Sequence, residues 1–259
     1  MKSIVTTGGR TNDVFVKRAK EIATELSLLY VNRQKKSVQK LQDEFQANII
    51  VVSKERLELY SYGSNAPFFF HPNSAAFRMK RLINGEQDLF LQATDLQNGD
   101  RFLDTTAGLC SDSIIAAYAV GEHGLVHACE KDDLVAYIVR QGLKSYEIDA
   151  TELLTSMRRV NLVRQDAIEF LKNTETDSYD VVYMDPMFEE VIEESTNFQA
   201  LREVGVHQGL TAEWVEEAKR VAKRRVVLKA HFRSPLFEQY HFKQLTRLTS
   251  KFHYGILEK

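Results

Sequence analysis

The sequence predicts an α/β protein built on a doubly wound, mostly parallel sheet, preceded by a small α/β subdomain. From residue 101 onward, short apolar strand patterns alternate with helix patterns. Near the middle of the chain, a buried strand runs through a turn of small residues into an apolar helix, over residues 101–120. Residues 1–60 show the same alternation on a smaller scale. We therefore expect an N-terminal subdomain over residues 1–75 and a larger domain over residues 76–259.

The N-terminal subdomain is expected to hold two helices and four strands. The first helix is capped near Thr11 or Asn12, and Val14 is expected on its apolar face together with Ala19 and Ile22. Ser37 caps the second helix. The strands are expected over 4–7, 28–31, 49–52 and 57–60, with the last two paired.

The larger domain is expected to begin with a helix over 74–83. The Trp214 side chain is expected in the core, because it lies on an amphipathic helix. Parallel strands are predicted over 102–104, 125–129, 162–164, 181–184 and 226–229. The helices between them are predicted over 112–120, 132–145, 150–159, 166–172 and 211–222, and a hairpin over 245–250 and 253–257 ends the chain.

Composition indicates an ordinary globular protein, with 44% hydrophobic and 27% charged residues among 259. The chain has no apolar run of eighteen residues and no apolar core of a signal peptide near its N-terminus, so we expect a cytoplasmic protein without a membrane partner. Its two cysteines, Cys110 and Cys129, cannot build a disulfide framework and lack metal-site spacing. No metal is expected.

The net charge of −2 conceals an asymmetry, because residues 1–81 carry +7 and the remainder carries −9. A basic N-terminal part predicts contact with a polyanion such as RNA, and it equally fits a solvated helical face. Arg10, after Gly8 and Gly9, is a candidate phosphate contact, as is the basic cluster of Arg33, Lys35 and Lys36.

Carboxylates follow four successive strands of the predicted parallel sheet: Asp104, Glu130, Asp166 and Asp185. Each one alone is typical of a helix N-cap. The carboxyl ends of parallel strands meet at one edge, where ligands of doubly wound proteins bind. Together the four carboxylates therefore predict a ligand site.

The turn after the first of these strands indicates which ligand binds. Gly108 allows close approach of the backbone, and Glu130 follows it by 22 residues, a spacing typical of an acidic residue that binds ribose hydroxyls. That spacing suits a nicotinamide dinucleotide or S-adenosylmethionine. The turn has a single glycine and lies between Asp104 and Asp112. These carboxylates repel a pyrophosphate and attract a sulfonium with its amino group, which favours S-adenosylmethionine.

The stretches Asp104-Thr-Thr-Ala-Gly-Leu-Cys-Ser-Asp112, Glu130-Lys131, Asp166-Ala167 and Asp185-Pro-Met-Phe188 resemble the class I methyltransferases. The most similar group is the bacterial family of small-subunit ribosomal RNA guanine-N2 methyltransferases. The resemblance covers roughly residues 100–230 and implies a Rossmann-like fold. It also implies that the cofactor is held by residues at the strand ends: Asp104, Ala107, Gly108, Ser111, Asp112, Glu130, Lys131, Asp166, Ala167 and Asp185.

The resemblance implies that Ser111 and Asp112 lie near the methionine end of the cofactor. Glu130 binds the ribose hydroxyls beside Lys131. Asp166 accepts a hydrogen bond from the adenine amino group, and Ala167 lies against the ring.

The Asp-Pro-Met-Phe motif suits methylation of an exocyclic amine, whose lone pair is delocalised into the base. Hydrogen bonds from the NH₂ group to the Asp185 carboxylate and the Pro186 carbonyl draw the lone pair out of conjugation. Asp185 is also a candidate general base. Phe188 is expected to stack on a base turned out of its helix, or else to pack in the core.

Two departures from the family pattern concern the substrate and the turn. Cys110 occupies a position where the family usually has glycine or a similar small residue, and Glu189–Glu194 is acidic where the RNA enzymes carry lysines. DNA or a small molecule therefore remains an alternative substrate. A nicotinamide-dependent oxidoreductase and a non-catalytic RNA-binding module that keeps the fold are the alternative functions.

Overall fold

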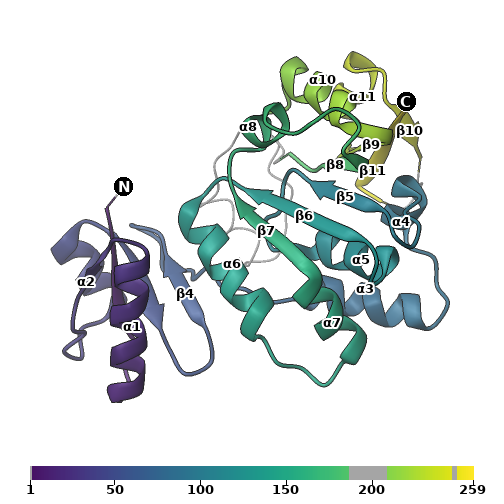
Figure 1. The fold of residues 1–259 in the computed structure, drawn as a ribbon. Coiled ribbons are helices and arrows are strands. Elements are labelled where there is room, and N and C mark those ends of the chain that lie inside the picture. The colour runs from purple at the N-terminus through teal and green to yellow at the C-terminus, as the bar shows by residue number, and fades with distance from the viewer. Residues whose placement is uncertain (1, 187–208, 247–249) are drawn as a thin grey trace. The chain divides into compact units, whose positions relative to one another are not determined.

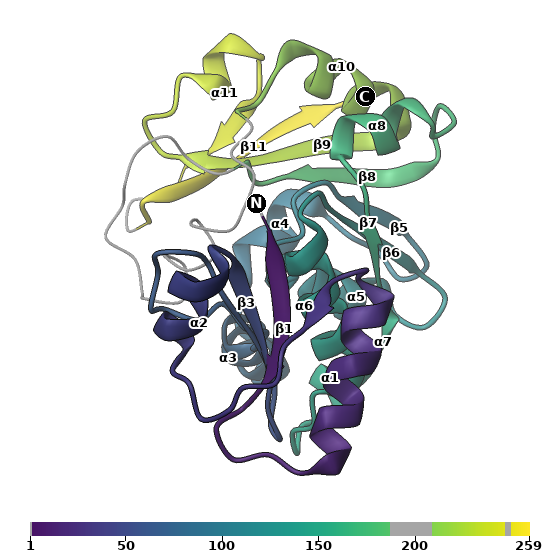
Figure 2. The same cartoon turned by 90° about the vertical axis from the view of Figure 1, so that its left-hand side faces the viewer.

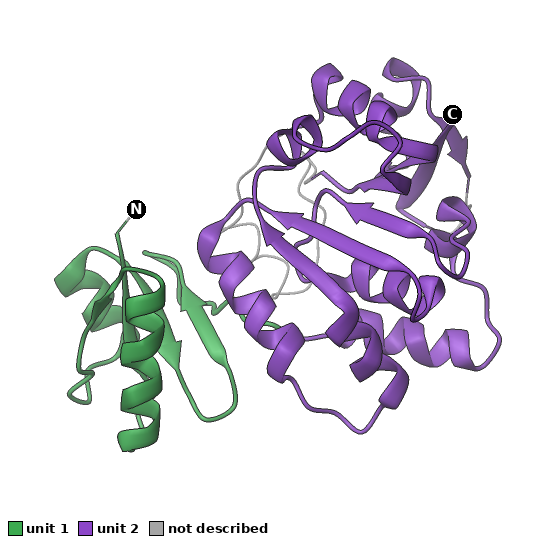
Figure 3. Ribbon diagram, viewed as in Figure 1, with its two compact units in different colours: residues 1–70, 193–205 green, residues 71–192, 206–259 purple. Residues whose placement is uncertain are grey.

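The computed structural model describes residues 2–186, 209–246 and 250–259. The described chain forms two compact units, which are coloured separately in Figure 3. Unit 1 comprises residues 2–70, and unit 2 comprises the described residues from His71 onward.

Unit 1 is a four-stranded sheet in the order β2-β1-β3-β4, with β4 antiparallel to β3 and the other pairs parallel. Side chains alternate along the strands, so Ile4 and Ile49 pack with Leu41 of α2 on one face. Figure 2 shows α1 on the other face. The elements are β1 (Ser3–Thr7), α1 (Asp13–Glu25), β2 (Leu29–Tyr30), α2 (Val38–Phe45), β3 (Asn48–Val52) and β4 (Leu57–Tyr60).

The predicted helix caps of unit 1 are confirmed, and one predicted core residue is wrong. The Asn12 side chain accepts from Phe15 N at 3.1 Å, and the Ser37 hydroxyl accepts from Lys40 N at 3.1 Å. Each such cap stabilises its helix by about 1 kcal/mol. Val14 is 69% exposed, because it lies in the first turn of α1, before the turns whose side chains pack on the sheet.

Unit 2 contains a seven-stranded sheet in the order β10-β11-β9-β8-β5-β6-β7. The strands from β9 to β7 are parallel, and β11 runs antiparallel between β9 and β10. The predicted doubly wound, mostly parallel sheet is therefore present. The strands are β5 (Arg101–Asp104), β6 (Leu125–Glu130), β7 (Val160–Arg164), β8 (Tyr179–Met184), β9 (Ala222–His231), β10 (Lys243–Leu245) and β11 (Phe252–Glu258).

Helices cover both faces of this sheet, as Figure 1 shows: α3, α5, α6 and α7 lie on one face, and α8, α10 and α11 on the other. Trp214 is buried in the core beneath α10, as predicted. The helices are α3 (Asn73–Ile83), α4 (Leu89–Thr94), α5 (Ser111–Val120), α6 (Asp133–Ser145), α7 (Thr151–Arg159), α8 (Ala167–Lys172), α10 (Ala212–Val221) and α11 (Leu236–Gln239).

Three features of unit 2 differ from the sequence prediction. The short helix α4 was not predicted, although Asp88 caps it. β9 is ten residues long because it pairs with β11 from Arg225 to His231 and with β8 at Ala222, beyond both ends of its apolar centre. The first strand of the C-terminal hairpin begins at Lys243 and ends at Leu245, and residues 247–249 of the predicted strand lie outside the described residues.

Candidate functional site

The predicted site residues follow strands that meet at the carboxyl edge of the unit 2 sheet. The chain leaves β5 through β6 to β7 and then returns to β8 on the other side of β5. This reversal makes the carboxyl ends of β5 and β8 the topological switch point, where doubly wound proteins bind their ligands. Asp104 closes β5, and Asp185 follows directly after β8.

Asp104 is turned into the protein and organises the turn after β5. Its side chain is 1% exposed and accepts hydrogen bonds from the Ser113 hydroxyl at 2.5 Å and from Thr106 N at 2.9 Å. Burial raises the pKa of Asp104 to about 7, although these hydrogen bonds oppose the shift. The sequence analysis missed Ser113, which lies among the apolar residues of α5.

The turn that follows has left-handed backbone at two positions. Gly108 has φ +47°, and Cys110 has φ +58° and precedes the first residue of α5. Left-handed backbone favours glycine, so Cys110 holds a conformation that residues with a side chain rarely adopt. The Cys110 side chain is fully buried, and burial raises the pKa of its thiol. Ala107 N donates to Cys129 O at 2.9 Å and holds the turn against β6.

Glu130 lies beside this turn at the end of β6. Its carboxylate accepts a hydrogen bond from Asp132 N at 2.9 Å, and backbone hydrogen bonds from Gly108 and Lys131 also reach it. Burial raises the pKa of Glu130, and these hydrogen bonds oppose the shift. The carboxylate thus joins the glycine turn to the start of α6, and three donors leave capacity on its two oxygens, which offer about four lone pairs.

Asp166 is both a helix cap and a member of an ion pair. One carboxylate oxygen accepts from Ile168 N at 3.0 Å and Glu169 N at 3.2 Å, which caps α8. The other lies 2.9 Å from the ammonium of Lys131. Burial raises the pKa of Asp166, but the hydrogen bond and charge of Lys131 together with the two capping hydrogen bonds outweigh burial and lower the pKa overall. Asp166 therefore caps α8 and also pairs with Lys131, which follows β6, and Ala167 is buried next to it.

Asp112 lies in the first turn of α5 and is held in a mostly buried ionic network. It accepts from Arg78 Nη1 at 2.5 Å and from the Tyr183 hydroxyl at 2.9 Å, and Lys229 Nζ lies 3.6 Å away. Although burial opposes ionisation, Lys229 and Arg78 lower the pKa of Asp112 to about 2. Ser111 precedes it as the half-buried first residue of α5.

Asp185 and Pro186 continue from β8 into the switch point. Asp185 N donates to the Thr106 hydroxyl at 2.8 Å, which joins the motif to the turn after β5. The Asp185 carboxylate lies 2.6 Å from Lys229 Nζ. Pro186 is buried, whereas Phe188 and the acidic stretch after it lie outside the described residues. Lys229 and Thr106 were missed as site residues by the sequence analysis.

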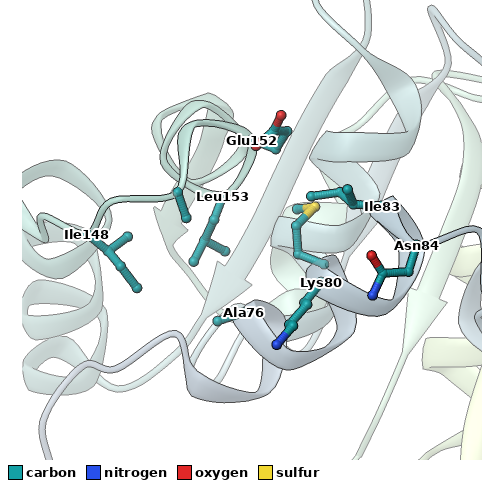
Figure 4. Close-up of a pocket in the computed structure, with 9 residues that line it drawn as sticks. Ala76, Lys80, Ile83, Asn84, Ile148, Glu152 and Leu153 are labelled. Carbon is teal, nitrogen blue, oxygen red and sulfur yellow. The ribbon is translucent and has the colours of Figure 1, made fainter.

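A pocket of about 330 Å³ lies elsewhere in unit 2, between α3 and the start of α7. Figure 4 shows its apolar side chains, including Ile83, Ile148 and Leu153. None of the predicted cofactor or catalytic residues lines it.

The candidate phosphate contacts of unit 1 divide into two groups. Arg33 Nη1 donates to Thr7 O and Nε to Lys36 O, both at 3.0 Å, so its guanidinium supports the fold. Lys36 pairs with Glu44 at 2.7 Å. Arg10 and Lys35 are exposed.

The chemistry of the switch point fits a cationic cofactor. Four carboxylates, Asp104, Asp112, Glu130 and Asp185, lie around the turn, and Arg78 and Lys229 pair with two of them. The carboxylates outnumber these two cations, so the turn repels a pyrophosphate. Among the described residues, no group of three or more His, Cys, Asp or Glu side chains is arranged to hold a metal ion. Within the same residues, none of the helices combines the length and apolar character that a membrane crossing requires.

Comparison with known proteins agrees with this chemistry. The family model described as "Putative SAM-dependent methyltransferase" matches residues 33–253. The Bacillus subtilis protein YpiP is 44% identical over 255 residues, which are 98% of this chain and 99% of that protein. A ribosomal RNA small subunit methyltransferase J from Pectobacterium atrosepticum is 35% identical over 191 residues, which are 70% of this chain and 74% of the relative.

The crystal structure of a SAM-dependent methyltransferase from Neisseria gonorrhoeae has a TM-score of 0.63 to this chain. It covers 98% of this chain and 95% of its own, at 18% sequence identity. This likeness confirms the predicted fold. The family match selects S-adenosylmethionine as the cofactor over a nicotinamide dinucleotide. The chain belongs to the family of class I S-adenosylmethionine-dependent methyltransferases.

Proposed function

We propose that this enzyme methylates the exocyclic N2 amine of a guanine in small-subunit ribosomal RNA. The observation that carries the proposal is the Asp185-Pro-Met-Phe188 motif, which continues directly from β8 at the switch point. Relatives named ribosomal RNA small subunit methyltransferase J support the choice of RNA. The buried, free cysteines Cys110 and Cys129 agree with action in the cytoplasm.

The cofactor is held at the carboxyl edge of the unit 2 sheet. When bound, S-adenosylmethionine supplies an electrophilic methyl group on a sulfonium. Glu130 binds the ribose hydroxyls beside Lys131. Asp166 accepts from the adenine amino group, and Ala167 lies against the ring. Ala107 and Gly108 form the turn that approaches the cofactor.

Three further residues act at the methionine end in different ways. Ser111 is half-buried in the first turn of α5, where it would contact the methionine end of the cofactor. Asp112 acts through its negative charge, because Arg78 and Tyr183 already bind its carboxylate. Asp104 shapes the turn from inside through Ser113 and Thr106.

The substrate amine is activated by hydrogen bonds that it donates. The Asp185 carboxylate and the Pro186 carbonyl accept from the NH₂ group and draw its lone pair out of conjugation. Phe188 stacks on the base, which is turned out of its helix so that the amine reaches the methyl group. Catalysis then rests largely on positioning.

Unit 1 contacts the RNA in this proposal. Arg10 and Lys35 are exposed and carry the predicted phosphate contacts, whereas the guanidinium of Arg33 is engaged in the fold. Phosphate contacts of this kind position an RNA without selecting its sequence.

Transfer of a labelled methyl group tests the proposal. The purified enzyme is incubated with S-adenosylmethionine and small-subunit ribosomal RNA from cells that lack the enzyme, and methylated nucleosides are identified by mass spectrometry. We expect N2-methylguanosine with the wild type. We expect none with Asp185→Ala, and retained binding of S-adenosylhomocysteine by this variant.

An exposed aspartate provides the control, because Asp149→Ala should transfer like the wild type. Undiminished transfer by Asp185→Ala would contradict the catalytic assignment. Methylation of another nucleotide would contradict the choice of guanine, and methylation of DNA or a small molecule alone would contradict the choice of RNA.

A further inference from the structure

Lys229 places a cation at the reactive end of the candidate site. It lies on β9 one residue beyond Leu228, which pairs with Met184 at the end of β8. Its ammonium lies 2.6 Å from one carboxylate oxygen of Asp185 and 3.6 Å from Asp112. The Lys229 side chain is only 24% exposed. A largely buried ammonium thus joins the Asp-Pro motif to the acidic end of α5.

The charge of this ammonium is secured by the groups around it. Burial lowers the pKa of Lys229, but Asp185 and Asp112 outweigh burial and raise the pKa above its usual value. Arg78 shares Asp112 with Lys229. Among the described residues, the titratable groups that face Lys229 and Asp185 from the packed elements include Asp104 of β5, Arg78 of α3, Asp112 of α5, Tyr183 of β8 and Tyr254 of β11.

Without Lys229, the surroundings of Asp185 would favour its protonated form. Asp112 is a like charge close to it, Asp104 is a second one when it is ionised, and the Asp185 side chain is largely buried. A protonated carboxyl has one oxygen that donates, and it attracts an NH₂ group less than a carboxylate does. The contact with Lys229 opposes this, and it also fixes the direction of the carboxylate.

We propose that Lys229 is a positioning residue for methyl transfer, which keeps the Asp185 carboxylate ionised and oriented toward the substrate amine. This inference rests on the proposed function. In the transfer, the bond from the amine nitrogen to the methyl carbon forms as the bond from sulfur to that carbon breaks. An ion-paired carboxylate is a weak base, so the amine proton leaves to solvent water, and Lys229 keeps its proton throughout.

Substitutions at Lys229 test this role through the pH profile. Single-turnover methyl transfer to the ribosomal RNA is measured from pH 5.5 to 9 with saturating S-adenosylmethionine. We expect Lys229→Met to transfer about 100-fold more slowly at pH 7. The transfer rate falls on the acid side of the profile as Asp185 is protonated, and we call this part of the profile the acid limb. We expect the acid limb of Lys229→Met to lie about 1–3 pH units higher than in the wild type. Lys229→Arg keeps the cation and should keep the wild-type limb.

Lys223→Met is the matched control. Lys223 lies at the other end of the same strand and pairs with Asp180 of β8 at 3.7 Å. Its removal should leave rate and pH profile unchanged. Binding of S-adenosylhomocysteine and the melting temperature establish that each variant is folded.

The outcomes separate this inference from the proposed function. A wild type that does not methylate the RNA overturns the proposed function, and the role of Lys229 with it. If the wild type methylates the RNA and the acid limb of Lys229→Met is not shifted, the role of Lys229 is overturned and the proposed function stands. If Lys229→Met does not fold, Lys229→Arg decides, because a shifted acid limb in this charge-retaining variant contradicts the inference.

Discussion

The guanidinium of Arg78 on α3 lies 2.5 Å from the carboxylate of Asp112 on α5. Its other nitrogens donate to Asp88, the cap of α4, at 2.8 and 2.9 Å. Arg78 on α3 therefore connects the N-terminus of α4 to the first turn of α5, which follows the glycine turn. Burial lowers the pKa of Arg78, but Asp112 and Asp88 outweigh burial and raise the pKa.

Removal of this arginine should destabilise unit 2 strongly. Arg78→Met removes the arginine that pairs with the largely buried carboxylates of Asp88 and Asp112, and Asp112 keeps Lys229 at 3.6 Å. We expect the free energy of unfolding to fall by about 3–5 kcal/mol. Urea unfolding followed by circular dichroism measures the change. Arg81→Met is the control on the same helix, because its pair with Glu86 is exposed and should contribute less than about 1 kcal/mol. Equal losses in the two variants would contradict the importance of burial.

Asp104 should make stability depend on pH. Its folded-state pKa is about 7, above the ordinary value of 3.8, so the folded protein binds the proton more tightly than the unfolded chain. The stability from this group is fully present below pH 4 and is lost as pH rises to about 7. Asp104→Asn removes the dependence. We expect the unfolding free energy of the wild type relative to this variant to fall by about 4 kcal/mol between pH 4 and pH 8.

Urea unfolding at each pH without cofactor measures this difference. Asp112, whose pKa is lowered, makes the folded protein less stable as pH falls below about 4. Because Asp112 is present in both the wild type and Asp104→Asn, the difference between their unfolding free energies reports on Asp104. Asp149→Asn changes an exposed carboxylate and should leave the pH dependence of the wild type. A constant difference between wild type and Asp104→Asn across the range would contradict the raised pKa.

Glu130→Gln should weaken cofactor binding without unfolding the protein. The amide keeps one acceptor for the backbone N–H groups but loses the charge that strengthens hydrogen bonds from ribose hydroxyls. A loss of about 1.5–3 kcal/mol corresponds to roughly a 10- to 100-fold rise in Kd. Calorimetric titration with S-adenosylhomocysteine measures it, and NAD should not bind either protein. Glu152→Gln changes an exposed carboxylate on α7 and should bind like the wild type.

The double variant Arg10→Ala with Lys35→Ala should weaken RNA binding and leave cofactor binding unchanged. Each lost phosphate contact lowers the slope of log K against log salt concentration by about 1. Filter binding of ribosomal RNA across salt concentrations measures the slope. Lys172→Ala with Lys219→Ala removes two exposed cations from α8 and α10 and is the charge-matched control. The same slope in both double variants would contradict contact through unit 1.

Local pattern was sufficient to predict most of the fold. The strand at 101–104, the glycine turn and the helix after it are contiguous, so each residue's apolar spacing or turn propensity was visible in the sequence. The long β9 was underestimated, because its outer residues are held by pairing with β11, which lies more than twenty residues further along. Helix α4 is six residues long, too short to show a periodic pattern.

The candidate site was predicted only in part, because contacts between residues that are distant in the sequence leave no local pattern. Carboxylates at strand ends were recognisable because a doubly wound sheet brings its strand ends to one edge. The charges that bind them were not, since Arg78 precedes Asp112 by 34 residues and Lys229 follows Asp185 by 44. No local spacing distinguishes Arg78 from the solvent-exposed arginine three positions later.

The alternation of strands and helices, the glycine turn, the four strand-end carboxylates and the family to which they point can all be recognised from the sequence. Those features are set by neighbours in the chain. Which carboxylates are paired, which are buried and which pKa values shift depends on the packed fold. Ionisation depends on desolvation and on charges a few ångströms away, and both arise when segments distant in sequence pack together.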